Sequence, residues 1–299
     1  MDLEGIHHVT CITADAPANR DFYVRVLGMR MVKKTVNQDD PSVYHLFYAD
    51  DGGSAGADIT FFEYPNAVRG DDGAGMVHRT LMRVASEQSL DFWSERLAGE
   101  DVEVQRPSAD RIEFADPEGL GLALVVDSPS DAALSATSPE IPAGHALRGF
   151  AGVEAMTPDP AADAAILVSL LGFERVESAW EARGQRRGGT VAYGRTDTPG
   201  RPGAGTVHHV AWASADDDHE SWQRRLAEAG VEVTPVIDRF YFRSIYFRMP
   251  SGVLFEIATM SPGFATDEDA DALGQRLSLP PKFEPWRERI ESVLTPLPG

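Results

Sequence analysis

The sequence predicts an α+β fold built from four similar β-α-β-β-β units, and three observations support this prediction. Residues 76–84 (MVHRTLMRV) match residues 206–213 (TVHHVAWA) as strand-like runs. Each run is followed by an acidic, amphipathic segment, 89–99 or 218–230, that ends in glycine. Each of these two units closes with a Pro-x-Gly turn before a final apolar run. Self-similarity of this kind indicates a repeated supersecondary unit.

The two amphipathic segments are expected to be helices that bury one stripe of side chains. A tryptophan and a leucine recur at positions i and i+4, which lie on the same face of a helix. These pairs are Trp93/Leu97 and Trp222/Leu226. Gly99 and Gly230 follow as the left-handed residues that commonly end a helix. The tryptophans therefore indicate helix core and not a cofactor site.

The other two units begin at residues 5–10 and 149–154, which read as strands. A helical segment follows each, and then a Leu-Gly dipeptide at residues 27–28 or 171–172 leads into further strands. The four units cover approximately residues 8–65, 76–127, 149–195 and 206–260. The predicted organisation is a domain at 1–127, a linker at 128–148, a domain at 149–261 and a tail at 262–299 with a short helix near 284–293.

Composition indicates an ordinary soluble globular protein. Apolar residues make up 42% and charged residues 25% of the 299 residues, and no run approaches the roughly 18 apolar residues of a membrane span. Cys11 is the only cysteine, which excludes an intrachain disulfide and a thiolate metal cluster. The acidic start, Met1–Gly5, does not resemble a signal peptide. We therefore expect a cytoplasmic location.

The charge balance narrows the possible partners. The chain has 47 acidic and 27 basic residues, a formal net charge of −20. Repulsion from phosphates makes a nucleic-acid partner or an anionic membrane surface unfavourable. Only three residues are lysines, namely Lys33, Lys34 and Lys282. This acidic, lysine-poor composition fits either a protein that works in high salt or an acidic protein from an arginine-rich source.

The high-salt interpretation makes a testable prediction about stability. Self-repulsion among like charges is screened by salt, so the melting temperature is expected to rise between dilute buffer and molar KCl. Thermal unfolding followed by circular dichroism over this range is the measurement. A melting temperature that stays flat or falls would contradict the high-salt interpretation.

Candidate metal ligands stand out from this pattern. Two His-His pairs, residues 7–8 and 208–209, begin the first and fourth units, and Glu256 interrupts the last apolar strand. A buried carboxylate there costs several kcal/mol unless it is paired or bound to metal. Two imidazoles and one carboxylate form the facial triad that holds non-haem Fe(II) with open positions. We therefore predict a metal site.

The repeats supply an internal control for this prediction. His209 aligns with Arg79, Glu256 with Ala123, and His8 with Gly152, so the second and third units lack the same donors. One metal ion per chain is expected, shared between the first and fourth units. These two units must then face each other.

The chain resembles the vicinal oxygen chelate superfamily, which contains glyoxalases, bleomycin-resistance proteins and extradiol dioxygenases. Within it, several segments are similar to the hydroquinone ring-cleaving dioxygenases. These segments are Gly5–Thr10, Val32–Asn37 with Tyr44–Leu46, Val207–His209, Asp238–Phe247 and Leu279–Pro281. The resemblance covers essentially the whole chain and implies two domains with cupped mixed sheets.

The resemblance also implies roles for individual residues. The metal ligands would be the second histidine of each pair with the carboxylate, namely His8, His209 and Glu256. The substrate pocket would be lined by His7, Thr10, His208, Arg239 and Tyr246, with His208 as an acid–base group. Glu63 would be the fourth ligand of a glyoxalase-like site, or else an exposed acid at a strand end. The remaining histidines, His45, His78 and His219, are interpreted as structural, and Arg243 and Arg248 as surface charges.

Three functions follow as alternatives. The first is an Fe(II)-dependent, extradiol-type dioxygenase, an oxidoreductase of aromatic compound degradation, that opens a hydroquinone-type or catechol-type ring with O₂; Mn, Zn or Ni are alternative metals. The second is a glyoxalase-like lyase or isomerase using Zn(II) or Ni(II), and the third is a non-enzymatic binder of small aromatics. The expected partners are a small aromatic diol and O₂, and a homo-oligomer is left open.

Overall fold

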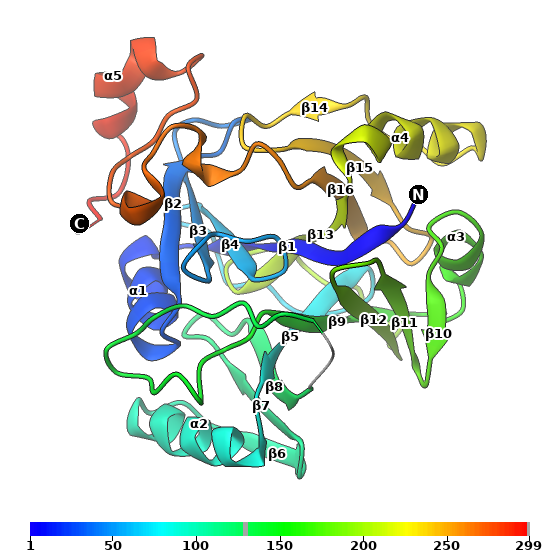
Figure 1. Ribbon diagram of the computed structural model, residues 1–299, viewed down its shortest axis with the longest axis horizontal. Coiled ribbons are helices and arrows are strands. Elements are labelled where there is room, and N and C mark those ends of the chain that lie inside the picture. The colour runs from blue at the N-terminus through cyan, green and yellow to red at the C-terminus, as the bar shows by residue number, and fades with distance from the viewer. Residues whose placement is uncertain (128–130, 298–299) are drawn as a thin grey trace.

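The four predicted units are present in the computed structural model, which describes residues 1–127 and 131–297 (Figure 1). The first unit contains β1 (Leu3–Thr13), α1 (Ala16–Arg20), the π-helical turn η1 (Asp21–Val26), β2 (Arg30–Val36), β3 (Tyr44–Ala49) and β4 (Asp58–Glu63). The second contains β5 (Met76–Val84), α2 (Glu87–Gly99), β6 (Gln105–Ser108), β7 (Arg111–Ala115) and β8 (Gly121–Val126). The third contains β9 (Phe150–Thr157), α3 (Ala164–Ser169), β10 (Glu174–Val176), β11 (Ala179–Arg183) and β12 (Gly188–Arg195). The fourth contains β13 (Thr206–Ser214), η2 (Asp216–Asp218), α4 (His219–Glu228), β14 (Ile237–Asp238), β15 (Arg243–Arg248) and β16 (Leu254–Thr259).

The strands form two mixed eight-stranded sheets, as the predicted α+β class requires. One sheet has the order β14-β15-β16-β13-β1-β4-β3-β2 and joins the fourth unit to the first. The other has the order β10-β11-β12-β9-β5-β8-β7-β6 and joins the third unit to the second. The predicted halves, 1–127 and 149–261, therefore do not correspond to the sheets, because each half contributes one unit to each sheet. Whether those halves are separate domains stays a prediction.

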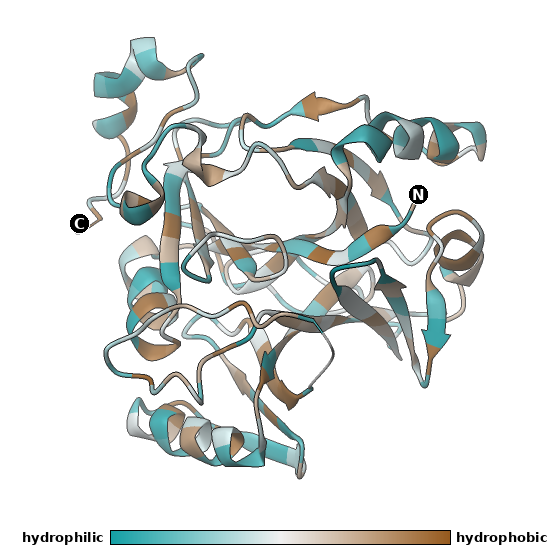
Figure 2. Cartoon of the chain, in the orientation of Figure 1, coloured by the Kyte–Doolittle hydropathy of each residue, from teal (hydrophilic) through white to brown (hydrophobic). Residues whose placement is uncertain are grey.

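Helices α2 and α4 bury the stripes that their spacing predicts. All four side chains of the two Trp/Leu pairs are inaccessible to solvent. Figure 2 shows hydrophobic and hydrophilic residues interleaved along α2 and a mainly hydrophilic α4. Gly230 has φ +80° and ends α4 as expected, but Gly99 is the last residue of α2 and the left-handed position is Asp101, with φ +58°. The prediction for Gly99 was therefore wrong, because the helix runs further than its glycine.

The two sheets pack closely where β1 meets β12. Gly5 has φ +76°, and a Cβ atom added there would lie 2.8 Å from the carbonyl carbon of Gly188. Only glycine permits this conformation and this approach of one backbone to another. The contact fixes the start of β1, and thereby the strand that carries His7 and His8.

The connecting segments pack against the sheets. In the linker, whose residues 128–130 lie outside the described chain, the His145 carbonyl accepts a 2.8 Å hydrogen bond from Trp93. The tail contains η3 (Phe264–Thr266), η4 (Ala270–Ala272), η5 (Glu284–Trp286) and α5 (Arg287–Glu291), so the predicted short helix is present. Ser278 donates a 2.9 Å hydrogen bond to the Lys34 carbonyl of β2, which fastens the tail to the first sheet. Across the described residues, no helix has both the length and the hydropathy needed to cross a lipid bilayer.

Candidate metal centre

Three adjacent strands, β16, β13 and β1, carry the predicted ligands. His8 and Glu256 both lie opposite Ala211 of β13, and side chains directly opposite one another lie on the same face of a sheet. His209 is two residues before Ala211, so strand alternation places it on that face as well. The small Ala211 side chain leaves the space between the three donors open.

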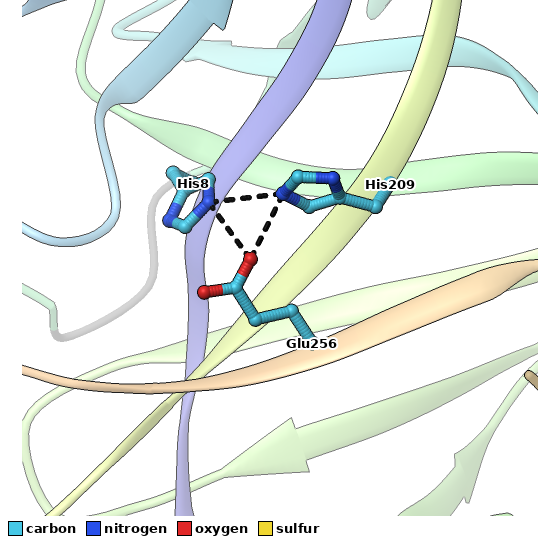
Figure 3. A group of neighbouring side chains, drawn as sticks. All are labelled: His8, His209 and Glu256. Atoms are coloured by element: carbon cyan, nitrogen blue, oxygen red, sulfur yellow. Dashed lines mark hydrogen bonds and ion pairs between the residues drawn. The ribbon is translucent and has the colours of Figure 1, made fainter. Parts of the chain in front are cut away.

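The three donor groups converge on one point, as Figure 3 shows. His209 Nε2 lies 2.9 Å from Glu256 Oε2, and His8 Nε2 lies 3.3 Å from the same oxygen. The two Nε2 atoms are 3.3 Å apart. All three side chains are at least nine-tenths buried. This is the single group of three or more potential metal donors found among the described residues.

The first histidine of each pair sits at a β-bulge. Along β1 the pairing moves from Ile6 to His8 while β13 advances by one residue, so His7 has no partner. A corresponding shift in β13 leaves His208 unpaired. Bulges re-aim side chains and are frequent beside active sites. Here they direct Nδ1 of His7 and His208 toward Nδ1 of the following histidine, at 2.9 and 2.8 Å.

The hydrogen bonds of His7 show which ring nitrogen of His8 carries a proton. His7 Nε2 lies 3.1 Å from the Thr259 carbonyl oxygen, which can only accept, so this nitrogen is protonated. Burial, together with the nearby His8, lowers the pKa of His7 to about 3, so its Nδ1 is an acceptor. His8 Nδ1 therefore donates to His7, which leaves Nε2 of His8 as the atom that faces the Glu256 carboxylate. In a neutral imidazole with its proton on Nδ1, Nε2 carries a lone pair, and a lone pair opposite a carboxylate suits a cation between them.

The charge state of Glu256 agrees with a cation site. Burial raises the pKa of Glu256, but positive charge on the facing His8 and His209 rings outweighs burial and holds the pKa well below its ordinary value. A metal ion bound between neutral rings would place the same positive charge there. Neither carboxylate oxygen has a hydrogen-bond donor in the described structure. Burial also lowers the pKa of His209, although Glu256 opposes this shift. A buried carboxylate beside neutral imidazole is the donor set that a borderline divalent metal prefers.

A pocket adjoins the three donors. Its wall is formed by the candidate ligand side chains, by residues of β2, β3, β4 and β15, and by the 38–39 and 239–242 segments. Beyond the ligands, the lining residues are Thr35, Val36, Gln38, Asp39, His45, Phe47, Phe62, Arg239, Tyr241, Phe242 and Tyr246. The wall combines phenylalanine and tyrosine rings with charged, amide and imidazole groups, and concave sites that join apolar walls to placed polar groups are typical of small-molecule binding.

Arg239 and Tyr246 meet in this pocket, as the sequence predicts. Arg239 Nε donates to the Tyr246 hydroxyl at 3.3 Å, and the guanidinium lies 5.4 Å from the centre of the Tyr246 ring. The partner of Arg239 is Asp39, at 3.0 and 2.9 Å, and not the neighbouring Asp238. Gln38 donates to the Arg239 carbonyl at 2.5 Å. A segment of the first unit thus fixes an arginine of the fourth.

His7 and His208, in contrast, do not line the pocket. His7 is buried behind His8, with both ring nitrogens in hydrogen bonds. The His208 ring is solvent-exposed and contacts Phe62 edge-on, at 5.7 Å between ring centres. The expectation that they line the pocket is therefore not supported. Their geometry makes them positioning residues for His8 and His209.

Thr10 is linked to a pocket residue, His45, through a chain of hydrogen bonds. His45 itself was not predicted to belong to the site. Thr60 Oγ1 donates to Thr10 Oγ1 at 2.9 Å and also lies 2.9 Å from His45 Nε2. His45, expected from the sequence to be structural, forms part of the pocket wall. The available signal was its alternation with Phe47, which placed both on one face of β3.

Glu63 lies away from the metal centre. Its partner on β1 is Thr13, five residues beyond His8, or about 16 Å along the strand. Its carboxylate accepts a 3.1 Å hydrogen bond from the Ala16 amide and is 1% exposed. Glu63 is therefore a buried acid at the end of β4 whose carboxylate binds the first amide of α1. Neither the fourth-ligand interpretation nor the exposed-acid alternative describes it.

The second sheet confirms the alignment of the repeats, in which Arg79, Ala123 and Gly152 take the places of the three metal donors. Leu81 occupies the place of Ala211, because it lies opposite both Gly152 and Ala123. Arg79, in the place of His209, pairs with Glu154 and Glu113 at 3.0 Å each. An ion-pair network thus stands where the first sheet has its donors.

Comparison with known proteins agrees with this architecture. A model of the glyoxalase/bleomycin resistance protein/dioxygenase superfamily matches residues 5–124 and 149–257, well over half of the chain. The chain belongs to this superfamily. A superfamily relative from Bacillus subtilis (strain 168), named "Putative ring-cleaving dioxygenase MhqO", is 41% identical over 98% of this chain and 96% of its own length. The chlorohydroquinone/hydroquinone 1,2-dioxygenase of Sphingobium indicum is 31% identical over 96% of this chain and 95% of its own length.

Solved structures of the superfamily show the same fold. The crystal structure of a candidate dioxygenase from Bacillus subtilis superposes with a TM-score of 0.92 at 39% identity, covering 99% of this chain and 98% of that one. Glyoxalase I from Zea mays gives a TM-score of 0.59 at 13% identity, covering 87% of this chain and 94% of that one. The maize enzyme is similar in fold alone.

Proposed function

We propose that this chain is a metal-dependent ring-cleaving dioxygenase that opens a hydroquinone-type or catechol-type ring with O₂, and that its native metal is Fe(II). The observation that carries the proposal is the convergence of two imidazole nitrogens and one carboxylate beside a pocket with aromatic and polar lining. Three protein ligands leave positions for substrate and O₂. Bound iron would supply the electron transfer that lets O₂ react with an aromatic ring. The names of the two superfamily relatives support the same reaction class.

The pocket residues have separate tasks in this proposal. Phe47, Phe62 and Phe242 exclude water and hold an aromatic ring by its faces and edges. The Arg239 guanidinium, oriented by Asp39, stabilises negative charge on a phenolate. Tyr246, beside the His209 ring at 5.7 Å between ring centres, hydrogen-bonds an oxygen of the substrate. His7 and His208 keep the imidazole ligands in the protonation state that leaves Nε2 free.

Oxygen uptake tests the proposed reaction. Anaerobically purified protein loaded with Fe(II) is expected to consume one O₂ for each hydroquinone or catechol lost, and to stop when the iron is oxidised. An oxygen electrode beside chromatographic loss of substrate gives both numbers. Turnover of a hemithioacetal without O₂, with no uptake on any diol tried, would instead indicate a glyoxalase-like lyase.

Arg239→Ala is expected to keep the metal and lose turnover by about 10²–10³-fold, the usual cost of removing one donor to developing charge. Arg243→Ala is the matched control, because Arg243 contacts Glu220 at 3.3 Å and is not part of the pocket wall. Metal content by mass spectrometry and kcat together are the measurements. Equal turnover in the two variants would remove Arg239 from the reaction.

A further inference from the structure

His45 lies on the face of the sheet that carries the metal donors. His8 and Thr10 share a face of β1, Thr10 lies opposite Thr60 of β4, and Phe62 of β4 lies opposite His45 of β3. Because side chains alternate along each strand, His8, Thr10, Thr60, Phe62 and His45 all lie on the same face of the sheet. Because strands are spaced about 4.8 Å apart, β3 lies roughly 10 Å from β1 across the sheet.

Hydrogen bonds fix the orientation and the tautomer of His45. Thr60 Oγ1 gives its proton to Thr10 Oγ1, so it can only accept from His45 Nε2, 2.9 Å away. His45 Nε2 is therefore the protonated nitrogen, and Nδ1 carries a lone pair. No residue in the described part of the chain hydrogen-bonds this Nδ1, which leaves it available to a ligand.

The surroundings keep this acceptor rigid and neutral. Phe47 and Phe62 flank the ring, with centres 3.9 and 4.4 Å from that of His45. Burial lowers the pKa of His45 well below its ordinary value, and the nearby His8 and His209 add to this shift. A neutral imidazole with Nε2 already engaged is an acceptor and not a donor at Nδ1.

The pocket therefore has two different ends. Tyr246 lies at the end of the metal donors, since its ring contacts the His209 ring, and Arg239 reaches from the Tyr246 hydroxyl to Asp39 beyond the end of β2. His45 lies two strands away and has no ring contact with either ligand histidine among those recorded for the described residues. A single ring whose first oxygen is held at the donor end points its far end toward β3.

We propose that His45 Nδ1 accepts a hydrogen bond from the free hydroxyl at the far end of an aromatic para-diol. This inference rests on the proposed function and specifies its substrate class: a ring with hydroxyls at opposite ends. His45 is then a recognition residue that discriminates against rings lacking the second hydroxyl. A site built to hydrogen-bond a hydroxyl rejects an analogue without it, because the buried polar group loses its partner.

The test compares two ligands of nearly equal shape, hydroquinone and 4-methylphenol, by anaerobic calorimetric titration of the metal-loaded protein. The wild type is expected to bind hydroquinone at least tenfold more tightly than 4-methylphenol. His45→Phe keeps a ring in the wall and is expected to lose this preference through weaker hydroquinone binding, with unchanged metal content. His78→Phe, in the second sheet, is the matched control and keeps the preference.

Thr60→Val supplies a second variant that removes only the hydroxyl that orients His45. It is expected to lose part of the preference, which would support the proposal even if His45→Phe fails to fold. Hydroquinone binding that is as tight and as selective in either folded variant as in wild type would overturn the proposal. If the wild type prefers hydroquinone but consumes no O₂, the role of His45 stands and the proposed ring cleavage is wrong. Failure of the His45 proposal can therefore be told apart from failure of the proposed function.

Discussion

Glu256→Ala and His209→Ala are each expected to abolish tight binding of the single metal ion. Each substitution removes one of three donors whose atoms lie within 3.3 Å of one another. The remaining two donors cannot complete the facial arrangement that holds the metal. Metal content after dialysis, measured by mass spectrometry, is expected to fall from one equivalent per chain to nearly none.

Arg79→Ala provides the matched control for these variants. Arg79 occupies in the second sheet the position of His209 in the first, so its removal disturbs an equivalent strand without touching a donor. It is expected to retain one equivalent of metal. Two tightly bound equivalents in the wild type, or one in Glu256→Ala, would contradict the assignment of a single site to the first sheet.

Thermal stability gives a readout that does not depend on dialysis. Metal that binds only the folded chain stabilises it by about 4 kcal/mol at a free concentration 1,000 times Kd. Added Fe(II) under nitrogen is therefore expected to raise the melting temperature of wild type and Arg79→Ala, and to leave Glu256→Ala unchanged. A similar rise in all three proteins would indicate binding elsewhere.

Lys33→Met is expected to lower the free energy of unfolding by about 3–5 kcal/mol, because it removes the ammonium that faces the buried Glu268 carboxylate and the partly buried Asp267 carboxylate. The Lys33 side chain is fully buried. Its ammonium contacts the Phe264 carbonyl at 2.9 Å, Asp267 at 2.8 Å and Glu268. It also lies 4.7 Å from the centre of the Tyr241 ring.

This lysine joins the tail to the wall of the pocket. Tyr241, a lining residue, donates to Asp267 at 3.0 Å, so Lys33, Asp267 and Tyr241 form one network. Loss of Lys33 is therefore expected to loosen the 264–268 segment and the pocket wall together. Urea unfolding followed by fluorescence measures the change in the free energy of unfolding.

A double variant separates the lost pair from an unpaired charge. Lys33→Met with Glu268→Gln removes both the cation and one buried anion, so it is expected to be more stable than Lys33→Met alone. Lys282→Met, which removes an ammonium packed on Phe283 at 4.8 Å, is expected to stay within about 0.5 kcal/mol of wild type. A Lys33→Met protein as stable as this control would show that the network adds little.

Much of the candidate site could be predicted from the sequence, because it depends on residue types and spacing within single strands. The Glu in an apolar strand, the two His-His pairs and the mismatched repeats indicated one metal site shared by the first and fourth units, and the resemblance then selected His8 and His209. Arg239 and Tyr246 followed from the resemblance. Strand alternation could not show that His7 and His208 sit at bulges, because a bulge depends on the partner strand. The second sheet repeats these register shifts at Ala151 and His78 without metal donors, so the fold sets them.

The sequence by itself determined the four units and the buried stripes of α2 and α4, since each is encoded by spacing within a few residues. The donor set of His8, His209 and Glu256 came from residue type together with the resemblance, and its role as a ligand set stays a prediction. Only the tertiary structure decided that β1 pairs with β13, some 200 residues away, and that the sheets cut across the two halves of the chain. It likewise decided that Asp39 orients Arg239 and that Thr60 orients His45. Such pairings depend on which surfaces bury each other best. The periodicity within one strand does not specify which distant strand will pair with it.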